Sequence, residues 1–144
     1  MVKFTVYGKP VPKGRPRFTT RNGFGVAYTP KKTHDAEKEV ARCAVLAGVK
    51  CIQKGCPVSV KLKFYMPIPK SFTKKKAEAA RCGELKFTQK PDIDNLAKII
   101  DGLNGIAWED DSQIVKLEVE KCYGDVPRTE ICIEKDANNV ESCS

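Results

Sequence analysis

Residues 90–115 read KPDIDNLAKIIDGLNGIAWEDDSQIV, and six of these side chains are acidic. The whole chain has a formal net charge of +8 at pH 7, so an acidic cluster is unexpected in it. Neighbouring carboxylates repel one another, and each disfavours the ionisation of the next. The stretch therefore predicts either carboxylates that lie far apart in the fold or a positively charged partner that offsets their repulsion.

The same stretch predicts a helix that starts near Asp92 and ends at about Leu103, before an Asn-Gly pair. Acidic residues at its beginning suit the helix dipole. The spacing of apolar residues predicts one buried face, made by Ile93, Leu96, Ala97, Ile100 and Leu103. Asp94, Lys98 and Asp101 would follow the opposite side of this helix.

Periodicity on both sides of this helix predicts a single domain of the α/β (α+β) class, with a mixed β-sheet and helices packed on it. Strands are expected at residues 2–8, 58–64, 113–121 and 129–134, with a short one at 85–87 and a hairpin of 17–20 with 24–28. Helices are expected at 31–47 and 74–81. The domain is expected to span residues 1–135, and residues 136–144 to form a frayed tail.

The composition argues against several classes of protein. A chain of 144 residues that is 41% hydrophobic can bury the core of one domain. No apolar run is long enough to cross a membrane and no stretch reads as a signal peptide, so a cytoplasmic protein without a membrane partner is expected. The seven cysteines include no CxxC pair and accompany a single histidine, which argues against structural zinc and against a disulfide scaffold.

Charge is distributed unevenly along the chain. Residues 1–90 carry a net charge of +16, whereas residues 91–144 carry −8. The segment KPVPKGRPRFTTRNG combines three prolines with five basic residues, which predicts an extended binding arm. A basic surface around an acidic spot suits a polyanion whose phosphates meet metal ions held by carboxylates.

The aspartates form two pairs with the chemistry of an oxygen-ligand metal site. Asp92 and Asp94 are two residues apart at the start of the helix, while Asp110 and Asp111 follow it, just before a strand. A helix that returns to the sheet beside its own start would bring the second pair back to the first. Carboxylates without histidine or thiolate suit Mg²⁺ or Mn²⁺, which can drive phosphodiester hydrolysis, and Lys98 would stabilise transition-state charge or position water.

Structural interpretations of the same residues stay open from the pattern alone. Asp92 and Asp94 would then cap the helix, Asp94 and Lys98 would form a surface ion pair, and Asp110-Asp111 would form a turn. Trp108 is expected in the core or at an interface. On this interpretation the chain would be a non-catalytic module that binds branched DNA, or a protein-interaction domain whose charges are solvated.

The segment KPDIDNLAKIIDGLNGIAWEDDSQIVKLEVEK resembles the RusA-type Holliday-junction resolvases, the crossover-junction endodeoxyribonucleases of bacteria and their phages. The segments GKPVPKGRPRF and YTPKKT resemble the same family. The resemblance covers most of the chain, from about Phe4 to Glu134, and its DxDN, Lys and DDxQ elements occur in the family's order.

The resemblance implies a homodimer that binds four-way branched DNA and nicks two opposed strands symmetrically with Mg²⁺ or Mn²⁺. It implies metal-binding carboxylates at Asp92, Asp94 and Asp111, with Asp110 able to share that role, and an essential lysine at Lys98. Asp101 is expected to have an ion-pair or supporting role. The residues expected to contact DNA phosphates are Lys13, Arg15, Arg17, Lys74, Lys75 and Lys76.

Overall fold

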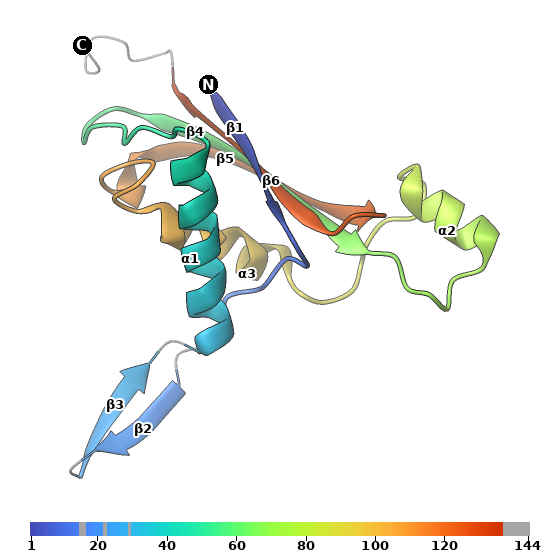
Figure 1. Ribbon diagram of the computed structural model, residues 1–144, viewed down its shortest axis with the longest axis horizontal. Helices are drawn as coiled ribbons and strands as arrows, with labels where there is room; N and C mark the ends of the chain where they lie inside the picture. The colour runs from blue at the N-terminus through green and yellow to red at the C-terminus, as the bar shows by residue number, and fades with distance from the viewer. Residues whose placement is uncertain (15–16, 22, 29, 137–144) are drawn as a thin grey trace.

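Residues 1–14, 17–21, 23–28 and 30–136 are described by a computed structural model (Figure 1). Its strands are β1 (Val2–Tyr7), β2 (Arg17–Arg21), β3 (Phe24–Tyr28), β4 (Val58–Pro67), β5 (Ile114–Gly124) and β6 (Arg128–Lys135). Its helices are α1 (Lys31–Leu46), α2 (Lys74–Arg81) and α3 (Ile93–Ala97), with two 3₁₀ helices, η1 (Lys98–Leu103) and η2 (Asp111–Gln113). The predicted order of elements is confirmed, with the exceptions given below.

Four strands form one mixed sheet in the order β1-β6-β4-β5. β4 and β5 run parallel, with Leu62 opposite Val119, whereas β6 runs antiparallel to both β1 and β4. Strands β2 and β3 form a separate antiparallel hairpin. The predicted α+β class, a single domain with a mixed sheet and packed helices, is therefore confirmed.

The core lies on one face of the sheet, between the strands and the helices α1, α3 and η1. Alternate residues of β4 are almost completely buried, as the period of a half-buried strand requires. The strands contribute Val58, Val60, Leu62, Phe64, Met66, Ile131 and Ile133, and the helices contribute Val40, Ala44, Leu96 and Leu103. The predicted core helix and strands thus meet in one hydrophobic layer.

The helix predicted over residues 92–103 has the expected limits but changes type at its middle, from α3 to the 3₁₀ helix η1. Gly102 lies where η1 crosses α1, and a Cβ atom at this position would stand 2.7 Å from the carbonyl oxygen of Glu37 and 2.9 Å from Val40 Cγ1. Because such separations are shorter than any van der Waals contact, only glycine permits η1 to lie this close to α1.

Three local predictions were wrong. Residues 85–87 form no strand; instead the ring of Phe87 packs edge-on against Tyr123, with 5.0 Å between centroids. Ile93, predicted on the buried face, is 39% exposed because it lies at the rim where α3 begins. Gln113, predicted to begin a strand, belongs to η2 and is buried.

Of the predicted tail, Asp136 donates its N–H to the Pro57 carbonyl, and residues 137–144 lie outside the described residues.

Two basic elements extend from the sheet in different directions (Figure 1). The β2–β3 hairpin extends beyond the N-terminal end of α1, and α2 lies at the opposite end of the molecule, past the C-terminal end of β4. The predicted hairpin and the predicted helix over residues 74–81 are both confirmed. No helix among the described residues is both long and apolar enough to cross a membrane.

Candidate active site

Asp92 and Asp94 are exposed at the start of α3. Asp92 occupies the N-cap position with extended backbone angles, but its side chain makes no capping hydrogen bond. Neither carboxylate forms an ion pair with a described residue. The interpretation of Asp92 as a hydrogen-bonded helix cap is therefore not supported, and both carboxylates remain available to another partner.

The chain just before Asp92 is held by a side chain that the sequence did not identify. Lys121, on β5, donates from its ammonium group to the carbonyl oxygens of Gln89 at 2.9 Å and Pro91 at 3.0 Å. The same ammonium lies 5.2 Å from the centre of the Phe87 ring. Lys121 thus ties the segment that precedes α3 to the sheet. Nothing in the sequence indicated this role, because it depends on carbonyl groups that are distant along the chain.

Asp94, Lys98 and Asp101 line one groove between α3–η1 and β5. The remaining lining residues are apolar: Ile93, Ala97, Ile100, Leu117 and Val119. Lys98 is exposed and forms no ion pair in the described part of the chain, so the alternative of an Asp94–Lys98 pair is not realised. The groove therefore places one unpaired carboxylate near one unpaired ammonium group.

Asp101 is paired with a residue of the N-terminal arm. Lys13 Nζ lies 2.6 Å from Asp101 Oδ2 and 3.6 Å from Glu37 Oε1, on α1. The hydrogen bond to Asp101 raises the pKa of Lys13 against the opposing effect of partial burial. Asp101 thus forms an ion pair with Lys13 of the N-terminal arm and not with a residue of its own helix.

The second pair of aspartates lies at the start of η2, with Asp110 as the N-cap residue. The carboxylate of Asp110 accepts the N–H of Ser112 at 3.1 Å, and its own N–H donates to Gln113 Oε1 at 2.9 Å, so Asp110 and Gln113 form a capping box. The N–H of Ser112 and the side chain of Asp111 hold the pKa of Asp110 below its usual value. The carboxylate of Asp110 is thus partly used in a local hydrogen bond, as expected if Asp110 and Asp111 form a turn. Asp111, next to it, is exposed.

Gln113 fixes this turn to the neighbouring loop. Its Nε2 lies 2.8 Å from the Gln53 carbonyl oxygen, 3.0 Å from that of Cys56 and 3.3 Å from that of Ile52. The side chain is 6% exposed, so these carbonyls have little access to water. The DDxQ pattern identified Gln113, but its structural role became visible only in the fold.

The aspartates have the donor atoms of a metal site, but the described part of one chain does not gather them into one. Carboxylate oxygens suit Mg²⁺ or Mn²⁺ by their chemistry. However, no group of three or more Asp, Glu, His or Cys side chains among residues 1–14, 17–21, 23–28 and 30–136 is placed to hold a metal ion. The roles of Asp92, Asp94, Asp110 and Asp111 as metal ligands therefore stay a prediction.

The family model for endodeoxyribonuclease RusA matches residues 7–134, which include β4, β5, all of β6 but its last residue, and the last residue of β1. The chain belongs to the RusA endodeoxyribonuclease family. It is also similar to the uncharacterized protein YqaN of Bacillus subtilis (strain 168), with 44% identity over 137 residues, covering 93% of this chain and 96% of the relative.

For a member of the RusA family, the basic residues are candidates for DNA contact. Lys74, Lys75 and Lys76 are exposed in the first turn of α2, whose N-cap residue Thr73 accepts the N–H of Lys76. The ammonium of Lys76 lies over the Phe72 ring, 4.3 Å from its centre. Arg15 lies outside the described residues, as does the side chain of Arg17.

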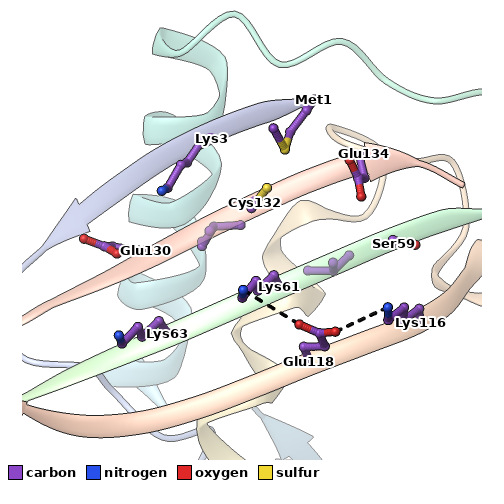
Figure 2. Close-up of a pocket in the computed structure, with 12 residues that line it drawn as sticks. Met1, Lys3, Ser59, Lys61, Lys63, Lys116, Glu118, Glu130, Cys132 and Glu134 are labelled. Atoms are coloured by element: carbon purple, nitrogen blue, oxygen red, sulfur yellow. Dashed lines mark ion pairs between the residues drawn. The ribbon is translucent and has the colours of Figure 1, made fainter. Parts of the chain in front are cut away.

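One surface hollow of this RusA-family chain lies away from the aspartates. It is on the open face of the sheet, with α1 behind the strands (Figure 2). Its lysines are largely balanced by glutamates: Glu118 lies 3.3 Å from Lys116 and 3.9 Å from Lys61. A charged face of this kind is typical of a sheet with one solvated side, and we assign no catalytic role to it.

Proposed function

We propose that this protein is a metal-dependent endodeoxyribonuclease that resolves Holliday junctions by paired symmetric nicks in DNA recombination and repair. The observation that carries the proposal is the position of Asp92, Asp94 and Lys98 within the family match. All three are exposed, and none is used in an ion pair with a described residue. Among the described residues, Asp94 and Lys98 are left unpaired in one groove, which favours a functional interpretation over a structural one.

Asp92, Asp94 and Asp111 are the proposed metal ligands, with Asp110 as a further candidate. When bound, Mg²⁺ or Mn²⁺ would supply an activated water and stabilise charge on the phosphate. Lys98 is proposed to neutralise negative charge that develops in the transition state. Asp110 contributes less directly, because its carboxylate already accepts the N–H of Ser112.

The proposed active form is a homodimer, because a two-fold symmetric junction requires two active sites related by a two-fold axis. An apolar surface that a second copy would cover lies along β5, at the edge of the sheet. Val115 is 61% exposed on this strand and lies outside the groove of Asp94 and Lys98. An unpaired edge strand with an exposed apolar side chain is a place where a second chain can pair.

DNA is proposed to contact the two basic elements of each protomer. Arg15 and Arg17 belong to the arm and hairpin, and Lys74 and Lys75 to the first turn of α2, and all four are proposed to bind phosphates. The expected place of action is the cytoplasm, where the DNA of a bacterium lies. Lys76 can contribute as well, although it also lies over the Phe72 ring.

The test is cleavage of a labelled four-way junction, compared with a linear duplex of the same sequence. Purified protein is incubated with each DNA in Mg²⁺, in Mn²⁺ and in EDTA. The proposal predicts nicks at symmetric positions in two opposed strands of the junction, only with a divalent metal. Tight junction binding without nicks in either metal would instead support a non-catalytic branched-DNA-binding module, a candidate favoured by the capping role of Asp110.

A further inference from the structure

We propose that Lys13 is a positioning residue that keeps Lys98 unpaired by holding Asp101. The inference rests on the proposed function for the role of Lys98 in the reaction, and on the structure alone for the contact between Lys13 and Asp101. It differs from the expectation that Lys13 contacts DNA phosphate, since it gives the ammonium a partner within the protein.

Lys13 is anchored by both its backbone and its side chain. Its N–H donates to the carbonyl oxygen of Asn95, on α3, at 3.0 Å. The neighbouring Gly14 N–H donates to Thr33 Oγ1 at 2.8 Å. With the backbone held in this way, the half-buried ammonium reaches Asp101 at 2.6 Å. Lys13 is held by its backbone and by its side chain, so it is a structural residue and not a mobile surface lysine.

Asp101 is also a natural partner for Lys98. The two residues stand three apart in η1, and side chains three apart eclipse one another in a 3₁₀ helix. Both line the groove that contains Asp94. An ion pair between them would compensate the positive charge that Lys98 is proposed to offer to the reacting phosphate. In the structure Asp101 is instead paired with Lys13, and Lys98 has no ion-pair partner among the described residues.

Glu37 increases the consequence of removing Lys13. Its Oε1 is buried and makes no hydrogen bond within the described residues, and the ammonium of Lys13 is 3.6 Å away. One lysine thus compensates two carboxylates at this point. Without Lys13, the negative charges of Glu37 and Asp101 would attract another cation. Lys98 can take this place because it lines the same groove as Asp101.

The decisive variants are Lys13→Met and the double variant Lys13→Met/Asp101→Asn, with Lys50→Met as the matched control. Methionine keeps the apolar stem of lysine and removes only its charge. Lys50 follows the C-terminal end of α1, is exposed and forms no ion pair with the described residues, so its replacement removes one charge without disturbing Asp101. Single-turnover junction cleavage and junction affinity are measured for each protein.

We expect Lys13→Met to cleave about tenfold more slowly than the wild type, a change of about 1.4 kcal/mol in the barrier, with little change in Kd. Adding Asp101→Asn should restore most of the rate, because the competing partner of Lys98 is then gone. Lys50→Met should cleave at close to the wild-type rate. If Lys13→Met weakens binding and Asp101→Asn restores nothing, Lys13 is a phosphate ligand and the proposal is wrong.

A second measurement separates this inference from the proposed function. Each lysine is labelled with a water-soluble amine-reactive ester and quantified by mass spectrometry. The labelling rate of Lys98 should fall in Lys13→Met, as it acquires Asp101 as a partner, and recover in the double variant. An unchanged Lys98 rate in Lys13→Met would overturn the inference even if the protein cleaves junctions. A wild type that cleaves no junction would overturn only the proposed function.

Discussion

At the scale of single residues, the candidate site depends on side chains that hold the aspartates as much as on the aspartates themselves. Lys121 ties the segment before Asp92 to β5, and Gln113 ties the turn of Asp110 to the loop at residues 52–56. The sequence identified the aspartates because paired carboxylates are recognisable from spacing. It did not reveal Lys121, because the carbonyls that this lysine binds come together only in the fold.

Replacing Gln113 by leucine should destabilise the protein strongly. The change removes the acceptor of the Asp110 N–H and the amide that donates toward the carbonyls of residues 52, 53 and 56, two of which also accept a backbone N–H. Because buried groups without partners cost about 1–3 kcal/mol each, we expect the free energy of unfolding to fall by about 3 kcal/mol, measured by urea denaturation.

The matched control for this variant is Gln53→Leu. The side chain of Gln53 is exposed, and only its backbone carbonyl is used by Gln113. Its replacement should change the free energy of unfolding by less than about 0.5 kcal/mol. A Gln113→Leu protein as stable as this control would show that the hydrogen bonds of the Gln113 side chain contribute nothing to the free energy of unfolding.

At the scale of elements, local sequence determined most of the fold and tertiary contacts determined the rest. β4 was predictable because five alternating apolar residues mark a half-buried strand, and α2 because Thr73 is a strong N-cap residue. The 3₁₀ geometry of η1 was not predictable from the sequence, because it occurs where Gly102 lies close to α1 in the folded chain. The strand expected at 85–87 failed for a similar reason, since Phe87 packs on Tyr123 instead of pairing with a strand.

Replacing Gly102 by alanine should push η1 away from α1. The added Cβ would lie 2.7 Å from a backbone oxygen, which cannot rotate aside as a side chain can. We expect the free energy of unfolding to fall by about 1–3 kcal/mol, despite the better helix propensity of alanine, which is worth up to about 1 kcal/mol. Thermal unfolding measures the change.

Gly25→Ala provides the comparison for this element. A Cβ at Gly25, in β3, would meet no atom within 4 Å. The thermal midpoint of this variant should stay close to that of the wild type. Equal midpoints for Gly102→Ala and Gly25→Ala would contradict the close-packing explanation of η1.

At the scale of the whole molecule, the basic first part of the chain supplies two elements that extend away from the sheet. The basic β2–β3 hairpin and α2 extend from the body of the molecule in different directions, and α3 lies on the body between them (Figure 1). Composition predicted a basic surface around an acidic site. Whether two copies associate could not be derived from spacing, because it depends on the apolar surface along β5 and on a second chain.

Replacing Lys74 and Lys75 together by methionine should weaken junction binding and reduce its salt dependence. Each DNA phosphate that the protein no longer neutralises lowers the slope of log Kd against log salt concentration by about 0.9, so the slope should fall by up to about 2. Fluorescence anisotropy over a range of salt concentrations measures it. Lys76 is left in place, because its ammonium lies over Phe72.

Lys61→Met/Lys116→Met removes the same number of charges from the open face of the sheet, where both lysines pair with Glu118. This control should change the slope much less. Equal slopes for the two double variants would mean that α2 contributes only general charge and no specific phosphate contacts.

The most direct test of the central claim is cleavage of a supercoiled plasmid that extrudes a cruciform, with wild-type protein and Asp94→Asn side by side. Paired incisions at one junction convert the circle directly into linear DNA, whereas unpaired incisions give open circles. We predict linear product from the wild type with Mg²⁺ or Mn²⁺, none in EDTA, and none from Asp94→Asn, which should still bind the cruciform. Linear product from Asp94→Asn at the wild-type rate would contradict the assignment of the carboxylate site, and plasmid left uncut by the wild type in both metals would contradict the nuclease itself.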